Sequence, residues 1–266
     1  FNVKLRAKGD RNIHRKDFES MSFKVDIKGD DRLFGFEEFS IQRPIIRNYS
    51  IEILIQEFMK TNDVLTVSTV PVKLFVNNEY FGIYHVEEGF SKEILEKNNR
   101  KDGPIAGIDE SLSTIFPDMQ LDYYSINKWI ANREELITEM NNKIIHTMVN
   151  YKKDNFDLCL NFDCSIWGKF FAITDFFGAQ HGAVPKSVKL YFNPSTGYIE
   201  PIFFDGHALN YVNLVNQLSF DSIKSNFEGT WYSSHIEWFR LFFNDRNEIF
   251  MTAYYNMLNE IISTKG

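Results

Sequence analysis

The residues best suited to chemistry lie in the stretch 170–210, FFAITDFFGAQHGAVPKSVKLYFNPSTGYIEPIFFDGHALN. An apolar run that carries Asp175 leads into a polar loop with His181, and two short β-like runs then deliver Asp205 into Gly206. A carboxylate is a good ligand for a hard cation such as Mg²⁺, and an imidazole can accept a proton near neutral pH. An acid followed by glycine after a strand is also a common turn, so residue types alone leave both interpretations open.

A hydrolase is a second hypothesis for this stretch, built on His181 with Asp175 or Asp205. It lacks a recognisable nucleophile, because the sequence contains no GxSxG elbow, HExxH, Walker loop or GxGxxG. Asp175 stands on an apolar segment, where burial would leave it either hydrogen-bonded or with a shifted pKa. A structural role for Asp175 is therefore the favoured interpretation.

Length and composition fit a folded globular protein. The 266 residues suffice for one large domain or two lobes that share a cleft, and 44% hydrophobic content with 16% aromatics supplies a core. A net charge of −7 argues against a general nucleic-acid binder, which would need a basic face. No apolar run reaches the roughly 18 residues of a membrane span, and nothing at the start is typical of a signal peptide. The chain opens in FNVKLRA without an initiator Met, which indicates an excised domain.

Two cysteines, Cys159 and Cys164, lie close together in LCLNFDC. A disulfide framework would need more cysteines, and four metal ligands do not occur nearby. The low count fits a reducing compartment but does not require one. Whether the two cysteines pair depends on backbone geometry, so the sequence leaves this open.

Alternating apolar and charged residues predict a β-rich first half. Three strands are expected, in FNVKLRA, SFKVDIKG and GFEEFSIQRP. The stretch NYSIEILIQEFMKT is then expected to form an amphipathic helix. Its apolar face is predicted from four residues at helical spacing: Ile51, Leu54, Ile55 and Phe58. VPVKLFVNNEYFGIYHVEE predicts a hairpin around Asn77-Asn78, and SKEILEKNNR predicts a short helix.

The second half is predicted to be mainly helical. Residues 103–117 are expected to form an irregular linker or inserted loop, and DCSIWGKFFAITDFF is the candidate for the most buried helix. The predicted division is therefore a β-rich half at 1–102 and a helical half at 103–266. Three strands, one helix, two strands and a connector into a short helix is the layout of the small lobe of a protein kinase.

Several segments together resemble the CotH kinase family, the group of spore-coat protein H and its bacterial relatives. They are VKLRAKGDRNIH, SFKVDIKGDD, FSIQRPIIRNYSIE, VKLFVNNEYFGIYHVEEGFSKEILEKNNRKDGPI and FFGAQHGAVPKSVKLYFNPSTGYIEPIFFDG, and they cover roughly 3–107 and 165–210. The resemblance implies an α+β fold of the atypical protein-kinase type, with a small antiparallel-sheet lobe that carries one helix and a larger, mainly helical lobe. It also implies an enzyme that binds ATP with Mg²⁺ or Mn²⁺ and phosphorylates Ser or Thr of a protein substrate.

The resemblance assigns roles to four residues of the second half. Asp205 would be the Mg²⁺ ligand, and His181 would stand where the catalytic acid or base lies, a position at which some relatives carry Asp and others carry His. Ser187 occupies the place of a second metal ligand, for which many relatives have Asn; a neutral hydroxyl coordinates only weakly. Lys186 brings a charge that could meet phosphate or repel metal. These departures keep open a catalytically impaired surface or coat module that retains the fold for binding.

In the first half, the resemblance points to charged residues on strands and on the one helix. Arg6, Lys8 and Lys24 could line a phosphate pocket, and Lys24 is the best candidate for the cation that contacts phosphate. Glu52 could pair with that cation, although an exposed helical glutamate is a common alternative. Glu87 would fall where a hinge meets adenine, with its backbone rather than its carboxylate forming the hydrogen bonds.

Overall fold

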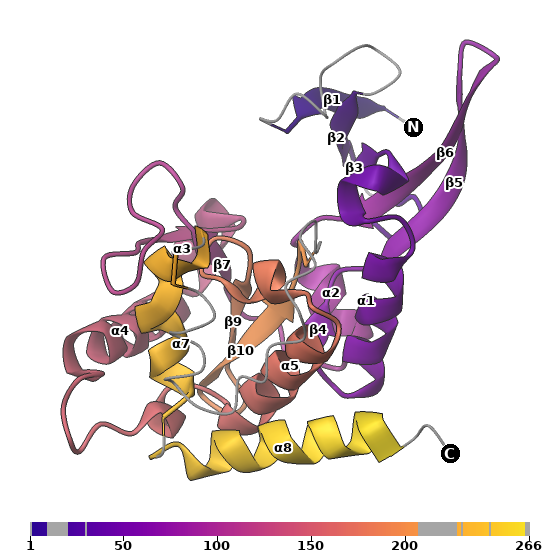
Figure 1. Ribbon diagram of the computed structural model, residues 1–266. Coiled ribbons are helices and arrows are strands. Elements are labelled where there is room, and N and C mark those ends of the chain that lie inside the picture. Colours follow the sequence, from indigo (N-terminus) through magenta and orange to yellow (C-terminus); the bar gives the residue numbers. More distant parts are fainter. Residues whose placement is uncertain are drawn as a thin grey trace.

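The protein is an α+β structure built on two five-stranded sheets (Figure 1). The computed structural model describes residues 2–9, 21–29, 31–206, 228–229, 231–244 and 246–263. The first sheet has the order β1-β2-β3-β6-β5 and the second the order β4-β10-β9-β7-β8. Among the described residues, no helix is both long and apolar enough to cross a bilayer.

The first sheet is antiparallel between every pair of neighbouring strands. Its strands are β1 (Val3–Lys8), β2 (Ser22–Ile27), β3 (Glu38–Gln42), β5 (Thr69–Val76) and β6 (Glu79–Glu88). The hairpin of β5 and β6 turns at Asn77 and Asn78, whose φ angles of 51° and 69° are those that a two-residue hairpin turn requires and that asparagine tolerates. The strands and the hairpin predicted for this half are confirmed.

The register of the first sheet separates an apolar face from a charged one. Arg6 pairs with Lys24, Lys24 with Ser40, and Ser40 with Glu87, so these side chains form one row across four strands. Because side chains alternate along a strand, Lys8 lies on the same face two positions after Arg6. The opposite face contributes to a small apolar cluster of Val25, Ile27, Phe36, Phe39 and Val86. The charged face therefore carries several of the cations that the sequence singled out.

Helix α1 (Ile51–Thr61) follows a short 3₁₀ turn, η3 (Pro44–Arg47), and packs against β4 and α5. The predicted helix is confirmed, but its predicted face is wrong by part of a turn. Ile51 and Leu54 are exposed, whereas Ile55 and Met59 are buried. The buried face also contains two polar residues, Glu52 and Gln56. Their burial turns an ionisable carboxyl and an amide inward, which apolar periodicity cannot predict.

The second sheet contains the hairpin predicted around Pro194–Gly197, formed by β9 (Lys189–Asn193) and β10 (Tyr198–Phe203). The short strand β4 (Leu65–Thr66), from the first half of the sequence, pairs in parallel with β10. On the other side, β9 pairs with β7 (Ile105–Ile108), which in turn pairs with β8 (Leu121–Tyr123). The expectation of an irregular 103–117 segment was wrong for β7, because a four-residue strand that is buried throughout shows no alternation.

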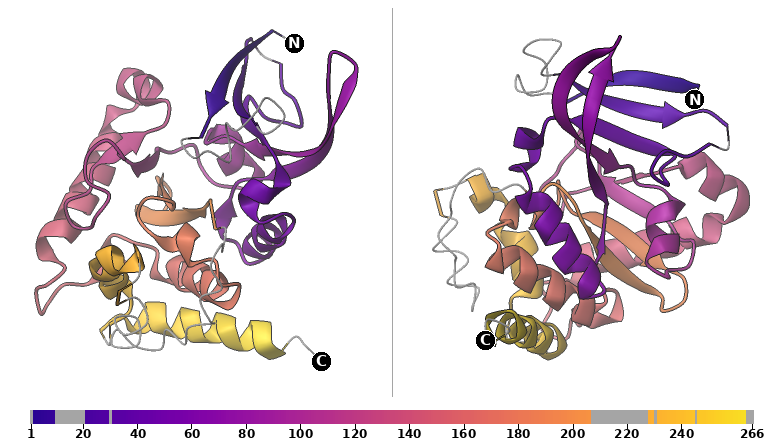
Figure 2. Two further views of the ribbon diagram at one scale, coloured as in Figure 1. Left: turned by 45° about the horizontal axis from the view of Figure 1, so that its top comes forward. Right: turned by 90° about the vertical axis from the view of Figure 1, so that its right-hand side faces the viewer.

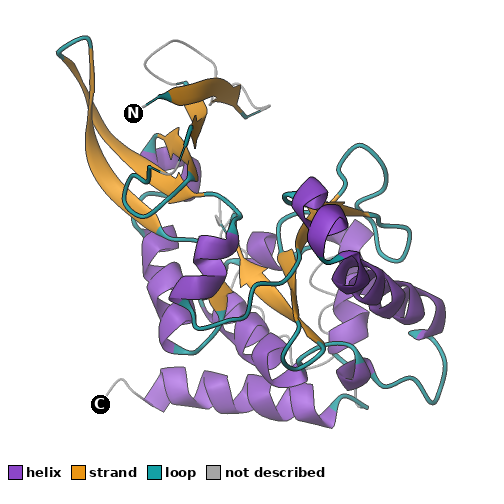
Figure 3. Ribbon diagram, turned by 180° about the vertical axis from the view of Figure 1, so that it is seen from behind, coloured by secondary structure: helices purple, strands orange, loops and turns teal. Residues whose placement is uncertain are grey.

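Helices surround the second sheet (Figures 2 and 3). They are α2 (Lys92–Lys97), α3 (Ile126–Asn132), α4 (Glu134–Asn150), α5 (Cys164–Phe176), α7 (Ile236–Phe242) and α8 (Glu248–Ser263). All of them except α2, together with α1, contribute to the main core. Helix α5 contacts β10, α1 and α8, and the long α8 lies along it. Ten of its thirteen residues are buried, so the prediction that this is the most buried helix candidate is in agreement with the structure.

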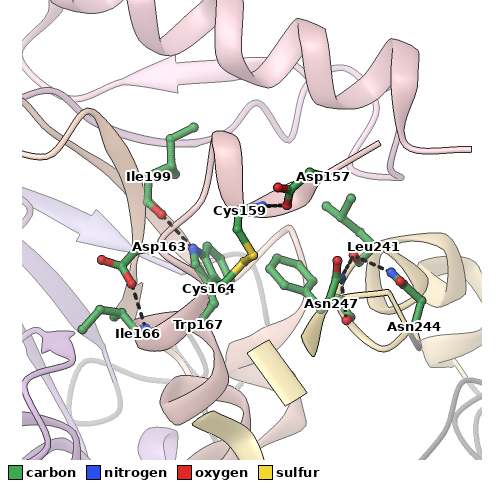
Figure 4. Close-up of a disulfide and its surroundings, with 11 residues drawn as sticks. Asp157, Cys159, Asp163, Cys164, Ile166, Trp167, Ile199, Leu241, Asn244 and Asn247 are labelled. Atoms are coloured by element: carbon green, nitrogen blue, oxygen red, sulfur yellow. Dashed lines mark hydrogen bonds between the residues drawn. A yellow bond between two sulfur atoms is a disulfide. The ribbon is translucent and has the colours of Figure 1, made fainter. Parts of the chain in front are cut away.

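A disulfide joins Cys159 to Cys164 at the start of α5, which settles the open question of their pairing (Figure 4). Asp157 accepts a hydrogen bond of 2.8 Å from the backbone N–H of Cys159. Asp163 caps α5 by accepting from the backbone N–H of Ile166 at 3.1 Å. Two carboxylates and one covalent bond therefore fix the entry of the chain into the central helix.

Candidate functional site

Asp205 follows β10 directly and contacts side chains from two other parts of the chain. Its φ of 57° lies in the left-handed region, which aspartate enters more readily than most residues. One carboxylate oxygen accepts a hydrogen bond from Nη1 of Arg47, and the other lies 3.5 Å from Nε2 of His181. The side chain is 22% exposed. This carboxylate is thus half-buried and already engaged by a cation.

Arg47 links the first sheet to the end of β10. It lies in η3, and its guanidinium donates to both carboxylate oxygens of Glu87 at 2.7 and 3.2 Å while it contacts Asp205. The group also lies 4.7 Å from the centre of the Phe204 ring, within cation–π distance. Burial acts to lower the pKa of Arg47, but the charges of Asp205 and Glu87 outweigh it and raise the pKa. Arg47 therefore stays charged at every relevant pH.

Glu87 is the centre of the polar cluster on the first sheet. Besides Arg47, it accepts hydrogen bonds from Nζ of Lys8 and Nε2 of Gln42, each at 3.0 Å, and its side chain is 1% exposed. Burial acts to raise the pKa of Glu87, but Arg47 and Lys8 lower it to about 2. These contacts engage the carboxylate within the chain. The expectation that the backbone of Glu87 meets adenine stays a prediction. That backbone lies in β6, between β3 and β5.

Glu52 approaches the same region from α1. One oxygen accepts a hydrogen bond of 3.3 Å from the backbone N–H of Gly206, and the other, Oε2, has no hydrogen-bond partner among the described atoms. Burial raises the pKa of Glu52 to about 8, against the opposing charge of Arg47. The predicted pairing of Glu52 with Lys24 is wrong, since Lys24 binds Glu38 at 2.6 Å. Glu52 is a buried carboxyl that is mostly protonated near neutral pH.

His181 lies in the 3₁₀ turn η5 (Gln180–Ala183) between α5 and β9, beside Asp205. A second imidazole, His235, is nearby: burial, then the charges of His181 and Lys186, lower the pKa of His235 to about 4. Asp175, in contrast, accepts hydrogen bonds from the Tyr254 hydroxyl at 2.6 Å and from Gln180 at 3.4 Å. These bonds fit the structural role favoured for Asp175.

Lys189, at the start of β9, is a cation that sequence reasoning missed. The residue is 6% exposed, and its ammonium donates to the backbone carbonyl of Lys186 at 3.0 Å. It also lies 5.6 Å from the centre of the Phe204 ring and 6.0 Å from that of Phe90. Burial lowers the pKa of Lys189 to about 8. The ammonium is therefore desolvated but still largely charged at neutral pH.

The other predicted site residues lie apart from the Arg47 contacts or make different ones. Arg6 is exposed on β1, on the face that carries Lys8. Lys186 forms an ion pair of 3.1 Å with Glu110. The hydroxyl of Ser187 is buried and has no hydrogen-bond partner among the described atoms. The structure thus brings together Lys8, Glu52, Glu87, His181 and Asp205 around Arg47, and it places Lys24 and Lys186 in ion pairs of their own.

Two sequence signals could have pointed to the missed residues. Arg47 ends the turn PIIR, which is otherwise apolar, shortly before α1 begins at Ile51. Lys189 opens the strand KLYFN directly before the apolar residues Leu190, Tyr191 and Phe192. A charge within an apolar element is costly to bury unless a partner or ligand compensates it. Such an exception to the apolar pattern is a reason to suspect a site, although only the fold identifies the partner.

The donor set fits a phosphate better than a free metal ion. Three cations, Lys8, Arg47 and Lys189, meet the ring of Phe204, whereas the described residues contain no group of three or more His, Cys, Asp or Glu side chains able to hold a metal. Mg²⁺ is commonly bound by one or two carboxylates together with substrate phosphates. Asp205 can serve in that way once Arg47 releases it. The residues therefore fit a metal that arrives with a nucleotide.

Comparison with known families and proteins gives one match. The model of the family described as CotH kinase protein matches residues 5–265, nearly the whole chain. The match includes the stretch 108–164 and the C-terminal helices, where the sequence motifs offered no resemblance. No curated protein matches the chain.

Proposed function

The chain belongs to the CotH kinase family, and we propose that it is an atypical protein kinase that transfers phosphate from ATP to Ser or Thr of a protein substrate, with Mg²⁺ or Mn²⁺. One observation carries the proposal: the buried chain of ion pairs from Lys8 through Glu87 and Arg47 to Asp205. Kinases act mainly by positioning phosphates and neutralising their charge, which requires cations and a metal-binding carboxylate at one place.

In this proposal the two halves, 1–102 and 103–266, act as the lobes of a kinase. The charged face of the first sheet supplies Lys8 and Glu87, and the end of β10 supplies Asp205. Arg47 bridges the two parts, so the nucleotide phosphates would bind where these elements meet. Gly206, next to Asp205, packs so tightly that a Cβ at that position would lie 2.3 Å from the Phe203 ring.

Asp205 would hold the metal ion together with the phosphate oxygens. A bound Mg²⁺ or Mn²⁺ would neutralise the charge that develops on the transferred phosphoryl group. Arg47 must then leave Asp205, and its remaining bonds to Glu87 keep it beside the phosphates. One guanidinium thereby serves as the counter-ion of Asp205 in the free protein and as a phosphate ligand in the complex.

His181 would act as the general base. The hydroxyl oxygen of the protein substrate attacks the γ-phosphorus, the bond from that phosphorus to the oxygen bridging to the β-phosphate breaks, and ADP leaves. The hydroxyl proton passes to the neutral imidazole of His181, whose contact with Asp205 stabilises the imidazolium that forms. Aspartate serves the same role in protein kinases.

A non-catalytic binding module is the second candidate. Ser187, a neutral hydroxyl, stands at the position expected for a second metal ligand, and Arg47 already neutralises Asp205. Both features would permit nucleotide or partner binding without transfer. Under this alternative the ion-pair chain would act as a structural link between the halves.

Two measurements separate the candidates. Thermal shifts with millimolar ATP, with and without Mg²⁺ or Mn²⁺, test nucleotide binding, and transfer of label from γ-labelled ATP to the chain or to a general acceptor protein tests chemistry. Asp205→Ala should abolish transfer, whereas Asp122→Ala, a change of an exposed aspartate on β8, should leave it intact. A metal-dependent shift without any transfer would favour the binding module, and the absence of a shift would contradict the kinase proposal.

A further inference from the structure

We propose that Lys189 is a phosphate-binding residue, which together with Arg47 and Lys8 grips the terminal phosphates of a nucleoside triphosphate around the ring of Phe204. The proposal rests on the proposed function and extends it to a lysine that no sequence motif identified. Ser187 is a weak ligand for a metal ion, so a second metal ion is not expected to supply positive charge there. In this proposal Lys189, two residues later at the start of β9, supplies that charge.

The first argument is the environment of the ammonium group. Lys189 is 6% exposed, yet among the described residues its Nζ has a single hydrogen-bond acceptor, the carbonyl of Lys186, and no carboxylate within ion-pair distance. An ammonium has three donors, and burying its charge without a counter-ion is unfavourable. For stability alone, an apolar residue at this position would be more favourable than a lysine, which indicates that the charge serves a ligand. An anion with several acceptor oxygens is the chemistry that satisfies such a group.

The second argument is convergence. The three cations lie 4.7 Å (Arg47), 5.6 Å (Lys189) and 5.8 Å (Lys8) from the centre of one ring, that of Phe204. They come from three elements, and Phe204 immediately precedes Asp205. The ring of Phe90 packs edge-on against Phe204 at 5.0 Å and keeps this region apolar. Glu87 and Asp205 hold two of these cations, Lys8 and Arg47. Among the described residues, Lys189 is left without a carboxylate at ion-pair distance.

The third argument is the charge balance. Glu87 compensates Lys8 and Arg47, and Asp205 compensates Arg47. When Asp205 turns to a metal ion, Arg47 loses part of its compensation, and Lys189 has none within ion-pair distance in the described part of the chain. Together these cations can bind a polyanion longer than a single phosphate. Triphosphate and pyrophosphate should therefore bind more tightly than monophosphate. The affinity for adenosine, which has no phosphate, should not depend on Lys189.

The test compares Lys189→Met with Lys169→Met by calorimetry. Lys169 on α5 is a matched control, because it is partly buried and its Nζ also donates to one backbone carbonyl, that of Asn62 at 3.3 Å. Losing a charged hydrogen bond to phosphate should raise the Kd for ATP and for pyrophosphate at least about tenfold in Lys189→Met. The Kd for adenosine should change by less than about twofold. Lys169→Met should bind all three probes as the unchanged protein does.

A second readout is the melting temperature of the free protein. Methionine removes a buried, poorly compensated charge at similar volume, so Lys189→Met should melt no lower than the unchanged protein and should lose most of the stabilisation by ATP. A lower melting temperature with an unchanged Kd for ATP would overturn the proposal and leave the kinase function standing. Pyrophosphate binding that depends on Lys189, in a protein that does not bind ATP, would keep the phosphate site and refute the kinase function. Failure of the unchanged protein to bind any of these phosphates would refute both.

Discussion

Arg47 and Asp205 form a partly buried, hydrogen-bonded ion pair across 158 residues of sequence. The same guanidinium holds Glu87 on the first sheet, so one side chain connects the two sheets at the residues that family resemblance marks as functional. Burying two charges costs hydration free energy. Removing one partner then leaves the other charge buried without compensation. Replacing Arg47 would consequently leave two carboxylates, Glu87 and Asp205, without their shared cation.

Replacing Arg47 should destabilise the protein strongly. Arg47→Met leaves Glu87 and Asp205 without their shared cation, and breaking a buried pair typically costs about 3–5 kcal/mol. The free energy of unfolding from urea denaturation measures the loss. Arg133→Met removes the exposed contact with Glu135 and should cost less than about 1 kcal/mol. Equal effects of the two substitutions would contradict the structural role of Arg47.

Glu52 should make the protein less stable as the pH rises. Its pKa is raised from 4.5 in the unfolded chain to about 8 in the folded protein, so between these values the folded state binds more protons. Stability should therefore fall from about pH 4.5 to about pH 8, with a slope approaching 1.4 kcal/mol per pH unit from this group.

The matched variant for this effect is Glu52→Gln, which resembles the protonated carboxyl and keeps an acceptor for the N–H of Gly206. It should equal the unchanged protein near about pH 4, below the unfolded pKa, and exceed it in stability near pH 8, as measured by urea denaturation at each pH. Identical pH profiles for both proteins would show that Glu52 is ionised in the fold.

Gly168 should not tolerate alanine, although it lies inside a helix. A Cβ there would lie 2.6 Å from the carbonyl oxygen of Phe250 and 2.7 Å from the Cβ of Ala253, so α5 and α8 would have to separate. Overpacking of this kind costs about 1–3 kcal/mol, which should exceed the gain of roughly 1 kcal/mol in helix propensity. Ser165→Ala, at an exposed position of α5, should bring the propensity gain alone. A more stable Gly168→Ala protein in thermal denaturation would refute this packing.

Reduction of the Cys159–Cys164 disulfide should lower stability moderately. The bond closes a short loop of five residues' separation, for which loop-closure entropy gives about 2 kcal/mol. Urea denaturation with and without dithiothreitol measures the difference. The double variant Cys159→Ser/Cys164→Ser should match the reduced protein and should not respond to the reductant. If dithiothreitol changed the stability of the double variant, the effect of the reductant could not be assigned to this disulfide.

Local patterns predicted much of the fold, and their failures have physical causes. Alternation identified β1, β2 and β3, turn residues identified both hairpins, and an apolar run identified α5. The short strands β4, β7 and β8 escaped, because two to four residues are too few to show a period. The face of α1 was misjudged because two polar residues, Glu52 and Gln56, are buried, which apolar periodicity cannot predict.

By itself, the sequence determined the family, the order of most elements, and a set of charged residues suited to phosphate chemistry. The tertiary structure alone decided the partners: it joined Arg47 to Glu87 and Asp205, sent Lys24 to Glu38 and Lys186 to Glu110, and buried Lys189 beside Phe204. The reason is physical. Local patterns indicate which backbone conformation a segment favours. The contribution of a charged side chain to the free energy depends instead on its desolvation and on counter-ions that the fold brings from distant segments.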